Sequence, residues 1–221
     1  MTTLAQPGCL ITFEGLGGCG KSTLVRRLAA WLEQASLPIA LTREPGGTPL
    51  GANLRGLLLE KGAVPVPWAE AFLFEADRAQ TYAEVIIPAL RDGKIVISDR
   101  NYYGTVAYQG FGRALDLDLI DRMTRAATGG HWPTLVVVLD VDPAIGLRRK
   151  YGQDAVDRFD EEDLAFQQRV REGYLFAAQR DPHAHVVDAA RAADDVFRDV
   201  CGIAAAALAD RLPPHVLEGH R

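Results

Sequence analysis

Cysteine is scarce in this sequence of 221 residues, and no two cysteines stand close together. Cys9, Cys19 and Cys201 lack the short spacings of zinc-binding and redox motifs. We therefore expect reduced thiols without a structural or catalytic role.

Long apolar stretches are also missing. No run of about 18 apolar residues is present, which excludes an obvious membrane-spanning helix. Residues 1–8 carry neither a basic start nor an apolar stretch, so no secretion or transit signal is visible. We expect no membrane partner and a cytoplasmic location.

Positive charge is not in excess, since the sequence has 24 Lys and Arg residues but 29 Asp and Glu residues, and its formal net charge is -5. Binding to the backbone of nucleic acids relies on clustered Lys and Arg. A general nucleic-acid binder is therefore excluded, and arginines gathered in a site would serve a small anionic ligand.

Apolar, β-branched segments alternate with segments of helical length. The strand candidates are residues 9–14, 38–42, 94–98, 134–140 and 185–187. The helix candidates are residues 21–35, 49–60, 68–90, 116–127, 143–150, 161–179 and 192–212. Several strand candidates are continuously apolar, as strands buried on both faces of a parallel sheet are.

This alternation predicts an α/β fold with a central parallel sheet of about five strands and helices on both faces. The length suits one domain, which we assign to residues 1–212, with a tail at 213–221.

The motif G-x-x-x-x-G-K-[ST] lies between the first strand and the first helix. Its residues are Gly15, Leu16, Gly17, Gly18, Cys19, Gly20, Lys21 and Ser22, and Thr23 follows. Glycines let successive amide groups point at phosphate oxygens, and the start of the helix adds the positive end of its dipole. We expect the loop to bind ATP, with Lys21 at the β and γ phosphates and the Ser22 hydroxyl on Mg²⁺. The alternative is a glycine-rich turn that matches by chance.

A polar pair, Asp99 and Arg100, follows the strand candidate at 94–98. Open α/β sheets bind ligands at the carboxyl ends of their strands. Asp99 is therefore a second candidate for orienting Mg²⁺ or its water ligands, and a structural ion pair with Arg100 is the alternative.

Three further segments concern the phosphoryl acceptor: Thr42-Arg43-Glu44-Pro45-Gly46-Gly47-Thr48, Phe72-Leu73-Phe74-Glu75-Ala76-Asp77-Arg78, and the stretch from Asp99 to Gln109. Together with the phosphate-binding loop, they resemble the thymidylate kinase family, and the resemblance extends over about residues 10–190. It implies a P-loop kinase fold, ATP and dTMP as substrates, Mg²⁺ as the cofactor and a homodimer.

The resemblance also implies roles for individual residues. Phe74 matches the residue that stacks on thymine and Arg78 the one that hydrogen-bonds the base, and residues four apart on a helix share a face. Arg55 and Arg100 match residues that hold the dTMP phosphate. The implied acceptor site is completed by Glu44, Pro45, Gly104, Thr105, the sugar-facing Tyr108 and the base-contacting Gln109. Core packing for Phe74 and Tyr108 and a solvated helix face for Arg55 are the alternatives.

Residues 147–160 resemble the mobile lid of the family. Lid closure excludes water and brings positive charge to the migrating phosphoryl group. Arg149 and Arg158 are the lid candidates, and they join Lys21, Asp99 and Arg100 in the predicted catalytic set. A solvated basic helix end is the alternative.

The sequence departs from the family at Gly17, where members usually carry Asp or Glu, and at Gly18, where eukaryotic-type members carry Arg. The second departure favours the bacterial type. Gly104 replaces a common serine, and Asn101 replaces the usual aromatic residue or histidine.

We predict transfer of the γ-phosphoryl group of ATP to dTMP, giving dTDP and ADP in dTTP synthesis, by positioning and charge stabilisation without a covalent intermediate. The nearest alternative is another nucleotide or nucleoside kinase of the same fold. A P-loop NTPase without a phosphoryl acceptor is a more distant one, because it leaves Phe74, Arg78 and Arg100 unexplained.

Overall fold

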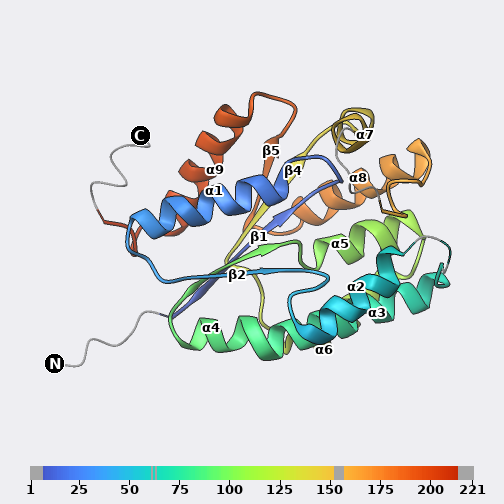
Figure 1. The fold of residues 1–221 in the computed structure, drawn as a ribbon, viewed down its shortest axis with the longest axis horizontal. Helices are drawn as coiled ribbons and strands as arrows, with labels where there is room; N and C mark the ends of the chain where they lie inside the picture. Colours follow the sequence, from blue (N-terminus) through green and yellow to red (C-terminus); the bar gives the residue numbers. More distant parts are fainter. Residues whose placement is uncertain (1–6, 61, 63, 152–156, 214–221) are drawn as a thin grey trace.

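A computed structural model of the chain describes residues 7–60, 62, 64–151 and 157–213. Its centre is a parallel sheet of five strands in the order β2-β3-β1-β4-β5 (Figure 1). The strands are β1 (Cys9–Glu14), β2 (Ile39–Arg43), β3 (Ile95–Asp99), β4 (Leu135–Asp140) and β5 (Ala184–Asp188). The predicted fold class is confirmed, and the strand boundaries agree with the prediction to within about one residue.

The three central strands, β1, β3 and β4, are buried along nearly their whole length. Their continuous Val, Ile and Leu runs suit a position with helices on both faces, while the edge strands β2 and β5 are partly exposed.

A charged residue ends each strand: Glu14, Arg43, Asp99, Asp140 and Asp188. Because parallel strands bring their carboxyl ends to the same edge, these charges gather on one side of the molecule.

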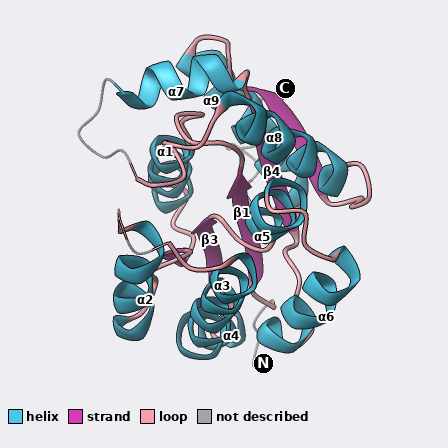
Figure 2. Cartoon of the chain, turned by 90° about the vertical axis from the view of Figure 1, so that its right-hand side faces the viewer, coloured by secondary structure: helices cyan, strands magenta, loops and turns pink. Residues whose placement is uncertain are grey.

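The α-helices are α1 (Lys21–Gln34), α2 (Pro49–Leu59), α3 (Pro67–Thr81), α4 (Ile87–Arg91), α5 (Tyr103–Thr105), α6 (Leu117–Thr128), α7 (Pro143–Tyr151), α8 (Leu164–Ala178) and α9 (Ala193–Ala207). Two π-helical segments, η1 (Tyr82–Ile86) and η2 (Val106–Gly112), continue α3 and α5. Helices α1 and α9 pack together on one face of the sheet, and the rod from α3 to α4 lies on the other (Figures 1 and 2). In the described residues, no helix has the length and apolarity required to span a bilayer.

The predicted helix at 68–90 is interrupted by the π-helical turn η1, which directly precedes α4 with Pro88 in its first turn. Proline has no N–H to donate, so the regular α-helical ladder is broken there and a wider turn takes its place. The predicted helix at 161–179 begins later, at Leu164, because the Asp163 side chain accepts a hydrogen bond from the Phe166 N–H and caps the helix. The predicted helix at 192–212 ends early, at Ala207.

The sequence did not predict the helical segment formed by α5 and η2. Three glycines, Gly104, Gly110 and Gly112, lower its intrinsic helix propensity. Packing against α8 compensates, because an added Cβ at Gly173 would lie 2.7 Å from the Ala107 Cα. Tertiary contact therefore decides the conformation of this segment.

Leu28 of α1 is fully buried in the core between the helix and the sheet. Leu28→Ala should lower the free energy of unfolding by about 2–5 kcal/mol, because apolar contact is lost and a cavity remains. The matched change Leu164→Ala, at a leucine that is 55% exposed, should cost no more than about 0.5 kcal/mol. Equilibrium urea unfolding measures both, and equal losses would contradict this placement of the core.

Candidate active site

A cavity of about 370 Å³ opens at the carboxyl edge of the sheet. It is lined by these predicted site residues: Gly17, Gly18, Gly20, Lys21, Ser22, Thr23, Glu44, Pro45, Arg55, Phe74, Arg78, Asp99, Arg100, Gly104, Thr105, Tyr108 and Gln109. The other lining residues are Arg43, Leu59, Asn101, Lys150, Asp157 and Phe159. The cavity therefore joins the phosphate-binding loop to the acceptor residues that the sequence indicated separately.

The phosphate-binding loop packs tightly against the end of β4 and against α7. An added Cβ would lie 2.4 Å from the Leu139 carbonyl oxygen at Gly15 and 2.0 Å from the Gly146 carbonyl oxygen at Gly18. Both glycines also have positive φ angles, 133° and 73°. Only glycine satisfies both conditions at these positions.

Lys21 begins α1, and its ammonium group donates hydrogen bonds to the carbonyl oxygens of Gly15 at 2.9 Å and Leu16 at 2.7 Å. Burial, together with the positive charge of Arg100, lowers the pKa of Lys21. Cys19 lies beneath the loop as a buried thiol, with its sulfur 3.4 Å from the Lys21 Nζ. Gly15, Leu16 and Cys19 thus support the loop from behind and do not line the cavity.

Ser22 and Asp99 meet at the mouth of the loop, where the Ser22 hydroxyl donates to the Asp99 carboxylate at 2.5 Å. These oxygens are of the kind that Mg²⁺ prefers. No cluster of three or more His, Cys, Asp or Glu side chains suited to a metal occurs in the described part of the chain. A metal at this pair would therefore depend on oxygens of the bound nucleotide.

Arg100 lies between the loop and the acceptor side of the cavity. Its Nη1 donates to the Gly15 carbonyl oxygen at 3.1 Å and to the Tyr174 hydroxyl at 2.5 Å, and its guanidinium lies 5.4 Å from the centre of the Tyr108 ring. The half-buried Arg55 of α2 also lines the cavity and donates to the Pro45 carbonyl oxygen at 2.9 Å. Burial and the charge of Arg43 lower the pKa of Arg55.

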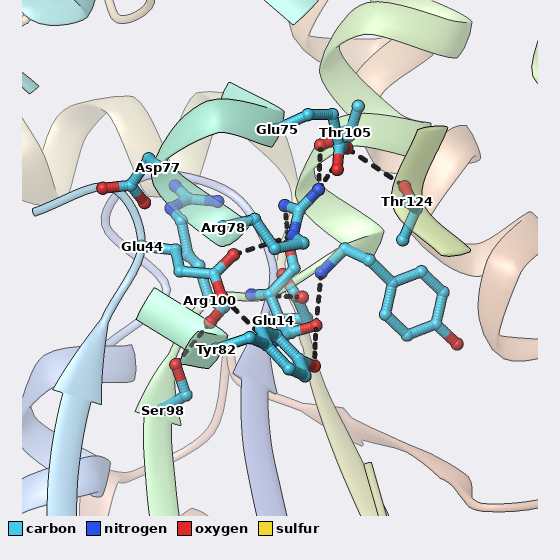
Figure 3. A network of polar contacts seen from close by, with 12 residues as sticks. Glu14, Glu44, Glu75, Asp77, Arg78, Tyr82, Ser98, Arg100, Thr105 and Thr124 are labelled. Atoms are coloured by element: carbon cyan, nitrogen blue, oxygen red, sulfur yellow. Dashed lines mark hydrogen bonds and ion pairs between the residues drawn. The ribbon is translucent and has the colours of Figure 1, made fainter. Parts of the chain in front are cut away.

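Arg78 is held on all sides within the wall of the cavity (Figure 3). Its Nε donates to Glu44 at 2.9 Å, and its Nη1 donates to Glu75 and to the Thr105 hydroxyl. Its Nη2 donates to the Asn101 carbonyl oxygen at 3.2 Å. Burial alone would lower the pKa of Arg78, but the two carboxylates outweigh it and raise the pKa well above its ordinary value.

Two carboxyl groups next to Arg78 and Asn101 are buried: Glu44 lines the cavity, whereas Glu14 does not. Glu14, at the end of β1, accepts a hydrogen bond from the Asn101 N–H at 2.8 Å, and burial raises its pKa to about 8. Burial likewise raises the pKa of Glu44 to about 7, against the opposing charge of Arg78.

Aromatic rings form the remaining wall. Phe74 lies 6.1 Å from Phe159, and Tyr108 meets Phe159 edge to face at 5.2 Å between ring centres. All three rings line the cavity, which leaves an apolar surface beside the buried guanidinium of Arg78.

The two predicted lid arginines lie outside the lining of the cavity. Arg149 donates to the carbonyl oxygens of Ala189 and Ala190, after β5. Arg158 is buried, where it donates to the Leu58 carbonyl oxygen and forms an ion pair with Glu70 at 2.8 Å. Part of the predicted lid, residues 152–156, lies outside the described residues.

Comparison with known proteins agrees with this geometry. The family model for thymidylate kinase matches residues 13–200. The chain belongs to the thymidylate kinase family.

Several bacterial relatives match over most of their length. A thymidylate kinase from Nitratidesulfovibrio vulgaris (strain DP4) is 49% identical over 209 residues, covering 90% of this chain and 93% of its own. One from Carboxydothermus hydrogenoformans is 45% identical and covers 88% and 96%. The crystal structure of thymidylate kinase from Ehrlichia chaffeensis superposes with a TM-score of 0.74 at 32% identity, covering 88% of this chain and 97% of that one.

Gly17, where the resemblance led us to expect a carboxylate, lies against acidic and basic side chains of another segment. An added Cβ would lie 2.9 Å from an Asp160 carboxylate oxygen and 3.2 Å from the Lys150 Cδ. Lys150 forms ion pairs with Asp157 and Asp160 directly above the loop. A carboxylate from the segment after α7 thus already occupies the space beside Gly17.

Sequence reasoning missed several residues of this thymidylate kinase site. Phe159 and Asp157 are the sequence neighbours of the predicted Arg158. Asn101 directly follows the predicted pair Asp99 and Arg100. Adjacency to a predicted site residue could therefore have indicated all three. Glu14 also carried a signal, because it ends a buried strand immediately before the phosphate-binding loop.

Glu14→Gln should flatten the pH dependence of stability. The folded protein holds the Glu14 proton up to about pH 8, whereas the unfolded chain releases it near 4.5. Stability conferred by this proton is therefore lost as the pH rises between these values, with a slope of up to about 1.4 kcal/mol per pH unit. Urea unfolding between pH 5 and pH 8 measures the slope. The exposed-site control Glu33→Gln should retain the wild-type slope, and an unchanged slope in Glu14→Gln would refute the assignment.

Proposed function

We propose that this chain transfers the γ-phosphoryl group of ATP to dTMP within the cavity at the sheet edge, producing dTDP and ADP. One observation carries the proposal: the phosphate-binding loop and the wall of Phe74, Arg78 and Gln109 line the same cavity. Membership of the thymidylate kinase family supports both substrates. The enzyme is accordingly a transferase of nucleotide biosynthesis.

At the phosphate end, Lys21 would bind the β and γ phosphates of ATP, and the loop residues that line the cavity, Gly17, Gly18, Gly20, Ser22 and Thr23, would bind the rest of the polyphosphate. Arg55 of α2 and Arg100 after β3 both line the cavity and would hold the dTMP phosphate. Their positive charge offsets the repulsion of two anionic substrates and positions the oxygens for in-line transfer. No general base is required, since a phosphate monoester is largely deprotonated at neutral pH.

Ser22 and Asp99 would hold Mg²⁺ together with phosphate oxygens of ATP. The adjacent hydroxyl and carboxylate fit such an ion. When bound, Mg²⁺ neutralises charge on the β and γ phosphates. In this chain, the Ser22 hydroxyl and the Asp99 carboxylate would supply the protein oxygens.

At the base end, Phe74 would stack on thymine while Arg78 and Gln109 read its polar edge. Tyr108 would lie against the sugar, and Glu44, Pro45, Gly104 and Thr105 would shape the remainder of the pocket. Arg78 is already fixed by four partners, so binding would require little further ordering of its side chain.

Residues 147–160 would act as the lid over ATP. From this segment, Lys150, Asp157 and Phe159 line the cavity, while Arg149 and Arg158 are bonded elsewhere. A catalytic role for either arginine therefore requires that its present contacts break when the nucleotide binds.

We also propose that residues 1–212 form one kinase domain with 213–221 as a tail, and that the enzyme acts in the cytoplasm. ATP is a cytoplasmic metabolite, and the buried cysteines are free thiols, which suits a reducing compartment.

The enzyme should release ADP from Mg-ATP at a rate that dTMP strongly stimulates. Lys21→Ala should lower the dTMP-dependent turnover by about a hundredfold or more, because charge stabilisation of the transferring group is lost. A coupled ADP assay measures both. The control Lys94→Ala should leave turnover unchanged. Lys94 is partly exposed and directly precedes β3, so it lies at the amino end of the strand, whereas the cavity lies at the carboxyl end.

The acceptor itself decides between the candidate functions. dTMP, dUMP, dCMP and thymidine compared side by side should show the highest kcat/KM for dTMP. ADP release that no acceptor stimulates would refute the proposal in favour of an NTPase.

A homodimer built on α2 and α3 is a further part of the proposal. Leu57, Val66 and Phe72 are 55%, 69% and 56% exposed on and between these helices, and apolar surface of this kind marks association sites. Sedimentation velocity should give about twice the 24.0 kDa of one chain. Phe72→Glu should yield monomers, whereas Val186→Glu, at an exposed site on β5, should not. A monomeric wild type would refute the dimer.

A further inference from the structure

Glu70 of α3 is a completely buried carboxylate that does not line the cavity. It shares a helix face with Phe74 and Arg78, since the three residues are spaced by four. Its Oε1 accepts a hydrogen bond from the Gln109 amide nitrogen at 2.7 Å, and its Oε2 pairs with Arg158 at 2.8 Å. Arg113 adds a longer contact at 3.4 Å. Every group around this carboxylate is thus a hydrogen-bond donor.

These contacts determine which end of the Gln109 amide faces Glu70. Arg113 and Arg158 can only donate hydrogen bonds, so both oxygens of Glu70 act as acceptors in these contacts. Gln109 must therefore turn its NH₂ group towards Glu70. Gln109 lines the cavity. With its NH₂ group turned towards Glu70, the side-chain carbonyl oxygen is the group that it presents to the cavity.

We infer that Glu70 is a positioning residue for base selection, which holds Gln109 so that an acceptor oxygen meets the nucleobase. The inference rests on the proposed function. Thymine carries an N–H donor at N3, whereas N3 of cytosine is an acceptor. A fixed acceptor oxygen accepts a hydrogen bond from thymine N3–H but repels the N3 lone pair of cytosine. Two acceptors buried against each other without a proton between them cost binding free energy. Glu70 thereby selects thymine without touching it.

Arg158 gains a defined role in this arrangement. It follows Asp157 and precedes Phe159, which both line the cavity, and it is anchored on the oxygen of Glu70 opposite to Gln109. One carboxylate therefore holds both the end of the predicted lid segment and the base-reading amide.

Glu70→Gln tests the inference, because the neutral amide both donates and accepts and no longer dictates the orientation of Gln109. The ratio of kcat/KM for dTMP to kcat/KM for dCMP should fall by about tenfold, which corresponds to about 1.4 kcal/mol. The ratio is measured on one sample and so does not depend on the folded fraction. The kcat at saturating dTMP should change much less than KM.

The control Glu162→Gln removes the other carboxylate partner of Arg113 but does not touch Gln109, and should leave the ratio unchanged. If Glu70→Gln leaves Arg158 buried without a counter-charge and fails to fold, the double variant Glu70→Gln/Arg158→Gln removes that charge and should show the same low ratio.

A double-mutant cycle with Gln109→Ala completes the test. Glu70→Gln should lower the ratio no further in the Gln109→Ala background. An unchanged ratio in Glu70→Gln, or an equal additional fall in that background, would overturn the inference while leaving the kinase activity established. A wild type without dTMP-stimulated ADP release would instead overturn the proposed function, and the inference with it.

Discussion

The parallel pairing of β3 with β1 on one side and β2 on the other is the constraint on which the cavity depends. It brings the carboxyl ends of three strands together, so that the loop after Glu14, the Asp99 side chain and the segment after Arg43 border one cavity. The Glu44 N–H continues the pairing beyond β2 by donating to the Asp99 carbonyl oxygen at 3.0 Å. Backbone hydrogen bonds therefore set the distance between the phosphate-binding loop and the acceptor wall.

The cationic side chains at the two ends of the cavity have different partners. At the phosphate end, Lys21, Arg55 and Arg100 donate to backbone carbonyl oxygens, contacts that leave their full positive charge for anionic ligands. At the base end, by contrast, the charge of Arg78 is balanced by Glu44 and Glu75. A polyanion is attracted to one end, and the other end presents no uncompensated positive charge to a neutral base.

The buried ion pairs serve geometry more than stability. Removing two charges from water costs about as much as their mutual attraction returns, but losing one partner of such a pair costs about 3–5 kcal/mol. Glu44 and Glu75 hold Arg78, and Glu70 holds Gln109 and Arg158, each through short contacts inside the protein. The side chains that would face the base are consequently fixed before any ligand arrives.

The sequence by itself determined what local spacing encodes. The phosphate-binding loop and the strand ends were predictable, because a loop between a strand and a helix needs no distant contact. The pair Phe74 and Arg78 was indicated by resemblance to the family, with which their four-residue helical spacing agreed. Tertiary structure decided the rest. The 103–112 helix depends on packing against α8, and Glu70 meets Gln109 across 39 residues of sequence. Such contacts arise only when separate segments pack together, and no local pattern encodes which buried donor will face which buried carboxylate.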